Sequence, residues 1–408
     1  MRKKVEIAQL ANGIRIVHLQ TPLAAAYCGL TINTGTRDEL DNEHGLAHFL
    51  EHLLFKGTKK RKGYHINNRL ESVGGELNAF TGKEETVIHA AILSSDFAKA
   101  LDLIADVSFN SIFPEAEIRK EREVIFDEIN SYKDSPSELI FDDFEEYIFP
   151  NCSLGRNILG DKKSLKHFYS IDLHRFVSRN YSTEQMVISS VGKISFKRVV
   201  KLVERYFSSF SIQPKQQDRI PPPAYKPFCK TINKNTYQTH CVIGNRAYQL
   251  ADERSAALTL LMNILGGPLS NSRLNTSLRE KYGLAYNVEA SYTPYQDTGL
   301  FNIYFGTSKA ALDNSINAVM AELKKLRTDK LTTLQLHRAK KQMIGQLIIA
   351  NESPEQLMLT MGKSLLSLNR IDTIEESLAK IHAVTPEMLF DIANELFDIN
   401  QLSTLTYM

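Results

Sequence analysis

No stretch of this sequence approaches the roughly 18 consecutive apolar residues that a membrane-spanning helix needs. The basic N-terminus is not followed by the continuous apolar segment of a secretory signal. A formal net charge of only +2 gives no general electrostatic case for binding nucleic acid or an anionic membrane surface. We therefore expect a cytoplasmic protein with no nucleic-acid or membrane partner.

Cysteine is also scarce. The sequence has four cysteines, which lie far apart and show no Cys-x-x-Cys spacing: Cys28, Cys152, Cys229 and Cys241. This usage does not provide the disulfide framework of a small secreted domain. Reduced thiols are expected.

Length and composition indicate a globular protein with more than one domain. A chain of 408 residues exceeds what one hydrophobic core normally organises, so two domains of about 200 residues are expected. Composition changes near residue 211, and three successive prolines, Pro221 to Pro223, exclude helix and stiffen the chain. We predict a linker at residues 211–223 that joins domains at residues 1–210 and 224–408.

The first half contains a histidine-rich stretch that runs from His44 to His52. On a helix, His48 and His52 project from one face because they are four residues apart. Two neutral imidazoles at this spacing are a ready pair of zinc ligands. Glu51 lies on the same side, where a carboxylate could take a proton from a metal-bound water. The order His-x-x-Glu-His is the inverse of the commoner His-Glu-x-x-His zinc motif.

The order of predicted elements begins again after the linker. Residues 239–243 resemble the strand at residues 29–32, and an apolar helix follows at residues 256–265. This repeat indicates two similar α+β halves. The positions that would correspond to the metal ligands are apolar around residues 257–261, so only the first half can hold a metal.

A long helix predicted from Glu115 to Tyr132 carries several glutamates. Glu121 and Glu128 are seven residues apart, about two turns, and therefore share a face. Taken alone, this pattern is typical of a solvated acidic face.

Together, the two motifs resemble the signature of the pitrilysin/insulinase family of inverted zinc metallopeptidases. That signature is His-x-x-Glu-His followed by a glutamate about 75 residues later, within the string Glu-Arg-x-Val-Ile-x-x-Glu. The second string runs here from Glu121 to Glu128, which lies 76 residues after His52. The residues from His48 to Arg61 look especially like the β subunit of mitochondrial processing peptidase and its bacterial relatives.

The resemblance implies a zinc endopeptidase that acts on peptides. It assigns one zinc ion per chain to His48, His52 and Glu128, with the fourth position open to water. It makes Glu51 the general base and gives Glu121 a supporting role. His44 could pair with His48 instead, but Gly45 follows it and the family helix begins near this point, so a capping or surface role is expected.

In the second half, the resemblance matches Arg279 and Tyr286 to a pair that faces the zinc site and could serve the tetrahedral oxyanion. The alternative is a tyrosine packed in a strand and a surface cation. The predicted strand at Glu76–Thr81 matches the family's edge strand, which takes an extended peptide by β-addition. Its residues are Glu76, Leu77, Asn78, Ala79, Phe80 and Thr81.

The family architecture implies an α+β fold of two homologous domains, each a mostly antiparallel sheet packed with helices, that forms half of a clamshell. Two such chains would close around a cavity for peptides or unfolded segments, with Arg279 and Tyr286 approaching the partner chain's zinc. A homodimer is expected, and a heterodimer with a related chain stays open. A non-catalytic scaffold or peptide-binding subunit is the alternative function, although the intact set of ligands and base favours an enzyme.

Overall fold

The computed structural model describes residues 5–211 and 218–408, which divide into two compact units. The first unit has three segments: the described residues up to Asn130, Arg156–Ile220 and Ala350–Ile371. The second unit also has three: Ser131–Gly155, Pro221–Ile349 and Asp372–Met408. Residues 212–217 of the expected linker lie outside the described residues. Each unit has its own sheet and hydrophobic core.

The first unit is built on a six-stranded sheet. Its strands are β1 (Val5–Gln9), β2 (Arg15–Gln20), β3 (Ala25–Ile32), β4 (Glu76–Thr81), β5 (Thr86–Leu93) and β6 (Met186–Gly192). They are arranged in the order β1-β2-β6-β3-β5-β4, and neighbours are antiparallel except β2 and β6, which are parallel. Strand β4 therefore lies at an edge of the sheet.

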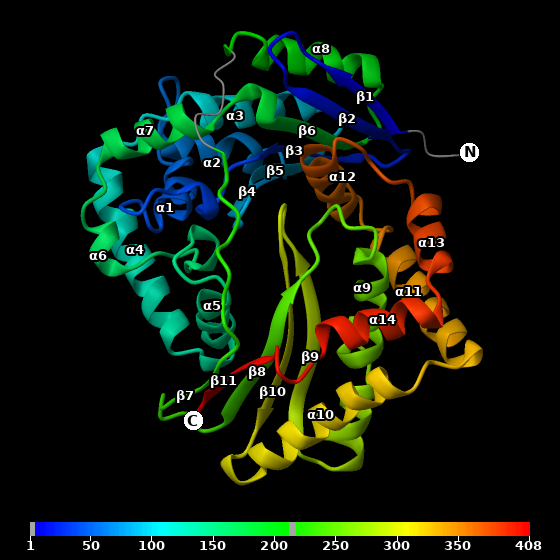
Figure 1. Ribbon diagram of the computed structural model, residues 1–408. Helices are drawn as coiled ribbons and strands as arrows, with labels where there is room; N and C mark the ends of the chain where they lie inside the picture. Colours follow the sequence, from blue (N-terminus) through cyan, green and yellow to red (C-terminus); the bar gives the residue numbers. More distant parts are fainter. Residues whose placement is uncertain (1–4, 212–217) are drawn as a thin grey trace. The chain divides into compact units, whose positions relative to one another are not determined.

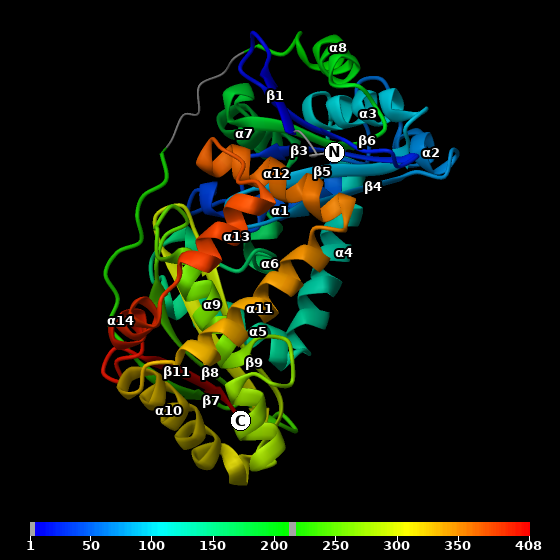
Figure 2. The same ribbon diagram turned by 90° about the vertical axis from the view of Figure 1, so that its right-hand side faces the viewer.

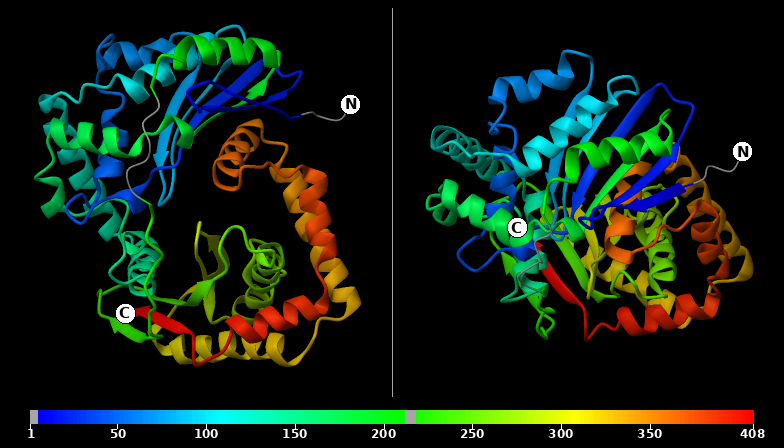
Figure 3. Two further views of the ribbon diagram at one scale, coloured as in Figure 1. Left: turned by 45° about the horizontal axis from the view of Figure 1, so that its top comes forward. Right: turned by 90° about the horizontal axis from the view of Figure 1, so that it is seen from above.

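Helices cover both faces of this sheet. The helices of the first unit are α1 (Leu46–Leu53), α2 (Gly63–Glu71), α3 (Phe97–Phe109), α4 (Glu115–Lys133), α6 (Lys162–Leu165), α7 (Ser170–Asn180), α8 (Phe196–Phe207) and α12 (Pro354–Leu368). Side chains alternate between the faces of a strand. On β2, Ile16 points into the core beneath α3 and α8, whereas Val17 points to the opposite face, which α12 covers (Figures 1 and 3).

The second unit is built on a five-stranded sheet. Its strands are β7 (Cys229–Ile232), β8 (Thr239–Ala247), β9 (Ala285–Pro294), β10 (Gly299–Thr307) and β11 (Ser403–Tyr407). They follow the order β7-β11-β8-β10-β9, with only β11 and β7 parallel. If β1 is left out, the strand order of the first sheet matches that of the second. When the five strands of each sheet are numbered along the chain, both sheets have the order first, fifth, second, fourth and third. The predicted fold of two α+β domains with mostly antiparallel sheets is confirmed.

Helices again cover both faces of the second sheet. The helices of the second unit are α5 (Pro136–Ile148), α9 (Ser255–Gly266), α10 (Leu312–Thr328), α11 (Thr333–Ala350), α13 (Ile374–Ala383) and α14 (Pro386–Leu396). Ile243 of β8 packs in the core formed with α9, α10 and α14, and α10 and α14 lie side by side (Figure 2). The neighbouring Val242 points to the other face and packs with α5.

Two segments lie in a different unit from the one expected for domains at residues 1–210 and 224–408. Residues 131–155, which include α5, belong to the second unit, and residues 350–371, which include α12, belong to the first. Each helix buries apolar side chains against its sheet, such as Phe144 of α5 and Met358 of α12. One face of each sheet is therefore covered by a helix from the other half of the sequence: α12 covers the first sheet and α5 covers the second. Among the described residues, every helix is too short or too polar to span a bilayer.

Candidate metal site

Helix α1 starts at a tightly packed backbone turn. Gly45 precedes the helix with φ of 90°, a left-handed conformation that glycine adopts without a steric penalty. A Cβ added to Gly45 would lie only 2.7 Å from Cα of Gly160. The buried carboxyl group of Glu39 accepts hydrogen bonds from the backbone N–H groups of Gly45 at 3.1 Å and Ala47 at 2.8 Å. These contacts satisfy donors that a helix start leaves free, and they fix where α1 begins.

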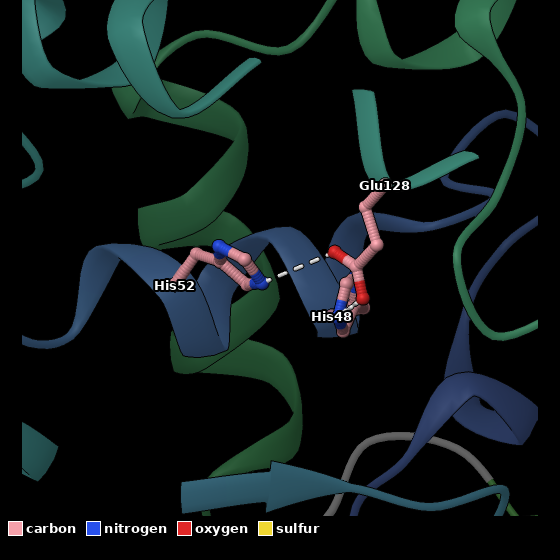
Figure 4. A group of neighbouring side chains, drawn as sticks. All are labelled: His48, His52 and Glu128. Atoms are coloured by element: carbon pink, nitrogen blue, oxygen red, sulfur yellow. Dashed lines mark ion pairs between the residues drawn. The ribbon is translucent and has the colours of Figure 1, made fainter. Parts of the chain in front are cut away.

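Three side chains that could bind a metal meet between α1 and α4. Glu128 Oε1 is 3.9 Å from His48 Nε2, and Glu128 Oε2 is 3.6 Å from His52 Nε2. Figure 4 shows the carboxylate of Glu128 beside the two imidazoles of α1. One donor atom from each residue lies within 4.8 Å of the others. The structure thus brings together the three residues that the family resemblance assigns as ligands.

The donor set fits a zinc ion. Ligand atoms about 2.1 Å from a tetrahedral zinc are roughly 3.4 Å apart, close to the separations of Glu128 from the two imidazoles. Burial, and next the neighbouring His52, lower the pKa of His48 to about 3, so its imidazole is neutral near pH 7 and offers a lone pair. Two histidines and one carboxylate leave a tetrahedral position open, which is typical of catalytic rather than structural zinc sites.

Glu51 lies next to the cluster and is held by the edge strand. Thr81, the last residue of β4, donates a hydrogen bond from Oγ1 to Glu51 Oε2 at 2.7 Å. Burial raises the pKa of Glu51, and the hydrogen bond from Thr81 opposes this effect. A carboxylate with a raised pKa is a stronger proton acceptor than an exposed one. The sequence placed Thr81 on the substrate strand but did not reveal this contact with the base.

Glu121 supports His52 from the other side of its ring. The buried carboxylate lies 3.3 Å from His52 Nδ1 through Oε2, and 2.7 Å from Lys56 Nζ through Oε1. With its proton on Nδ1, His52 donates to Glu121 and keeps the Nε2 lone pair free for a metal. Glu121 and Glu128 are therefore not a purely solvated acidic face. Lys56 was not among the site residues predicted from the sequence, because it follows the end of α1 and its position four residues after His52 does not by itself place it on the same helical face.

His44 takes no part in the cluster. Its Nε2 lies 3.0 Å from the carbonyl oxygen of Asn157, and its Nδ1 lies 3.5 Å from a carboxylate oxygen of Asp161. In the described part of the chain, the group of residues that could hold a metal ion contains His48 but not His44. The His44 side chain thus connects the start of α1 to the loop at residues 157–161.

Strand β4 has the six residues predicted as a substrate strand, and it pairs with β5 along one side. Its side chains alternate between exposed and half-buried. The exposed ones are Glu76, Asn78 and Phe80, and the half-buried ones are Leu77, Ala79 and Thr81. Since α1 packs against β4, the edge of the sheet lies beside the helix that carries the candidate ligands.

Arg279 and Tyr286 belong to the second unit. Arg279 lies in a π-helical turn at Asn275–Lys281, and Tyr286 lies in β9, with the guanidinium carbon 5.6 Å from the tyrosine ring centroid. Tyr286 is 80% exposed, and both residues line a hollow of about 400 Å³. The tyrosine is therefore not packed in the strand, whereas Arg279 is exposed, as the alternative expected of a surface cation. Both side chains are available at the surface of this unit.

Comparisons with known sequences identify two matching family descriptions. Insulinase (peptidase family M16) matches residues 15–162, and the peptidase M16 inactive domain matches residues 171–343. The uncharacterized zinc protease YmxG of Bacillus subtilis is 35% identical over 387 residues, which cover 95% of this chain and 94% of the relative. An uncharacterized zinc protease of Rickettsia felis is 32% identical over 399 residues, which cover 97% of this chain and 96% of the relative.

Solved structures share the fold. A protease from Helicobacter pylori superposes with a TM-score of 0.91 at 22% identity, covering 100% of both chains. A peptidase M16 inactive domain from Pseudomonas fluorescens gives a TM-score of 0.92 at 20% identity, covering 99% of this chain and 97% of the other. The first sequence match contains all of the clustered residues on α1 and α4, whereas the second contains Arg279 and Tyr286.

Proposed function

Because this chain belongs to the insulinase family of peptidases (peptidase family M16), we propose that it is a zinc-dependent endopeptidase. The observation that carries the proposal is the meeting of His48, His52 and Glu128 next to the carboxylate of Glu51. The substrates are peptides or unfolded segments.

Each side chain of the site has a task in peptide hydrolysis. Zinc, bound by the two imidazoles and the carboxylate of Glu128, would supply a Lewis acid that polarises a peptide carbonyl and lowers the pKa of water. Glu51 accepts the proton of the attacking water, and the same carboxyl group can return it to the leaving amine. Thr81 orients Glu51 through its hydrogen bond, and Glu121 holds His52 in the tautomer that leaves Nε2 free.

Strand β4 binds the substrate as an additional strand. Its position at the sheet edge and its contact with α1 support this role. Backbone hydrogen bonds would then provide affinity with little demand on the substrate's sequence. Since Thr81 ends the strand and bonds to Glu51, a peptide paired with β4 would pass close to the base.

A homodimer completes the site, with Arg279 and Tyr286 contributed by the partner chain. The exposure of Tyr286 and its proximity to Arg279 support this assignment, because a phenol and a guanidinium at a surface can both donate hydrogen bonds to an oxyanion. A heterodimer with a related chain remains the alternative.

The central test compares cleavage of a mixed peptide pool by the wild type, Glu51→Gln and Glu123→Gln, with bound zinc measured in each protein. Glu123 is an exposed carboxylate on α4 and serves as the matched control. We expect Glu51→Gln to keep its zinc and lose about 10²–10⁴-fold in turnover, the usual contribution of general base catalysis. Equal cleavage by all three proteins would exclude Glu51 as the base.

The same experiment separates the enzyme from the scaffold alternative. A wild-type protein that binds peptides but takes up no zinc after repletion would support a peptide-binding subunit. The dimer is tested by light scattering and by mixing Glu51→Gln with Tyr286→Phe. A mixed homodimer would regain one complete site, so activity should rise above that of either variant alone. No gain after subunit exchange would contradict the contribution of Tyr286 in trans.

A further inference from the structure

The candidate metal site continues beyond its ligands as a row of alternating partners. One side of the row comes from α1 and the turn that follows it, and the other side comes from α4. His48, His52 and Lys56 succeed one another at four-residue spacing, and they face Glu128 and Glu121 of α4. The carboxylate of Glu121 uses one oxygen for Lys56 Nζ at 2.7 Å and the other for His52 Nδ1 at 3.3 Å. Lys56 is thus connected to a candidate ligand through a single side chain.

The setting of Glu121 makes this connection stronger than an ordinary surface ion pair. Glu121 is only 8% exposed, so its charge is largely removed from water. A buried carboxylate is costly unless a cation or hydrogen-bond donors compensate it, and removing one partner leaves an uncompensated charge. The side chain of Lys56 is 32% exposed, which is compatible with an ammonium group committed to Glu121.

The neighbouring lysines show no such commitment. Lys59 and Lys60 are exposed, and neither has an ion pair among the described contacts. Lys56 is therefore distinguished from the basic run that follows it by its partner and by its burial. Exposed ion pairs contribute little to stability, whereas the carboxylate that Lys56 contacts at 2.7 Å is buried.

We propose that Lys56 is a positioning residue of the metal site. By holding one oxygen of Glu121, it fixes the carboxylate so that the other oxygen accepts the Nδ1 proton of His52 and orients that imidazole toward the metal. Without the ammonium, the Glu121 carboxylate is free to rotate and His52 loses a fixed acceptor. The inference rests on the zinc site proposed above, but it concerns metal affinity and ligand orientation rather than turnover.

The test measures zinc affinity by competition with a chromophoric chelator in the wild type, Lys56→Met, Lys56→Arg and Lys60→Met. Partners that orient metal ligands typically contribute 10–100-fold to affinity, so we expect Lys56→Met to bind zinc about tenfold more weakly. Lys56 lines a hollow of about 690 Å³, which leaves room for the longer arginine, so Lys56→Arg should restore most of the affinity. Lys60→Met should match the wild type.

A second measurement reports geometry directly. The visible absorption of the cobalt-substituted protein depends on ligand orientation, and it should change in Lys56→Met but not in Lys56→Arg or Lys60→Met. In the metal-free protein, the ring nitrogen shifts of His52 should show the Nδ1–H tautomer in the wild type and a mixture of tautomers in Lys56→Met. Neither a general loss of stability nor a change of surface charge produces this pattern.

Several outcomes would overturn the inference. Lys56→Met with wild-type zinc affinity and an unchanged cobalt spectrum would show that Glu121 needs no lysine. A Lys56→Arg variant that folds but binds zinc as weakly as Lys56→Met would also contradict the inference. If Lys56→Met does not fold, Lys56→Gln replaces it, and the same comparisons apply. A wild-type protein that binds no metal would refute the proposed zinc site itself. A wild-type protein that binds zinc, with Lys56→Met unchanged, would refute only the role of Lys56, so the two failures are distinguishable.

Discussion

Replacement of Gly45 by alanine tests whether the backbone contact before α1 controls the metal site. Gly45 has φ of 90°, and its Cβ would meet Gly160 Cα at 2.7 Å and the Leu159 carbonyl oxygen at 2.9 Å. Both obstacles are backbone atoms, so the strain cannot be relieved by rotating a side chain. We expect Gly45→Ala to destabilise the fold and to displace the start of α1 at Leu46, two residues before His48.

The size of the effect follows from two contributions. A left-handed conformation costs an L-residue about 1–2 kcal/mol relative to glycine. Forcing an extra carbon into a packed position costs about 1–3 kcal/mol more. Alanine also restricts the unfolded chain, which offsets about 0.4–1 kcal/mol. Gly45→Ala should therefore lower the free energy of unfolding by about 1–5 kcal/mol, and the estimate is dominated by the packing contribution.

Gly74 provides a matched control. It has φ of 74°, but nothing lies within 4 Å of the Cβ that alanine would add. Gly74→Ala carries the conformational cost alone, so chemical denaturation should show Gly45→Ala less stable than Gly74→Ala by about 1–3 kcal/mol. Zinc affinity should fall in Gly45→Ala and stay unchanged in Gly74→Ala. Equal stabilities of the two variants would refute the argument from close backbone approach.

Four further predictions concern the site and its surroundings. Glu128→Gln should weaken zinc binding by more than about 100-fold in chelator competition, because a neutral amide replaces a charged ligand. Even residues that only hydrogen-bond to metal ligands contribute about 10–100-fold. The control Glu123→Gln should leave the affinity unchanged. Chelation should abolish peptide cleavage, and addition of zinc should restore it. Zinc should also raise the melting temperature of the metal-free protein. Cleavage that survives complete metal removal would contradict the mechanism. Thr81→Val should keep its zinc and lower kcat by about 10- to 150-fold at most. A hydrogen bond to a charged group, such as the one that orients Glu51, is worth about 1.5–3 kcal/mol. Burial raises the pKa of Glu39 from 4.5 to about 8, so the unfolded chain releases this proton first and the contribution of Glu39 to stability falls as pH rises through that window. This is tested by urea denaturation of the wild type and Glu39→Gln at several pH values. The free energy of unfolding of the wild type should fall relative to that of Glu39→Gln as the pH rises toward 8. A difference between the two proteins that does not change with pH would contradict this pKa.

Local patterns predicted much of the fold. The strand at residues 76–81 has the predicted bounds, and the helices predicted at residues 115–132 and 256–265 are observed at residues 115–133 and 255–266. Such predictions succeed because alternation, helical periodicity and turn residues act over a few positions. The same reasoning failed to assign residues 131–155 and 350–371 to their units. An amphipathic helix shows that it has an apolar face, but its sequence does not specify which sheet covers that face.

The candidate site divides in the same way. The sequence by itself determined that His48, Glu51 and His52 share one side of a helix, because helical geometry requires only their spacing. It also determined that Glu121 and Glu128 lie on one face of a second helix. Only the tertiary structure decided that the second helix packs where Glu128 reaches both imidazoles, that β4 brings Thr81 to Glu51, and that Lys56 holds Glu121. The physical reason is that these contacts join segments far apart in the chain, and their distances depend on how whole elements pack rather than on any local period.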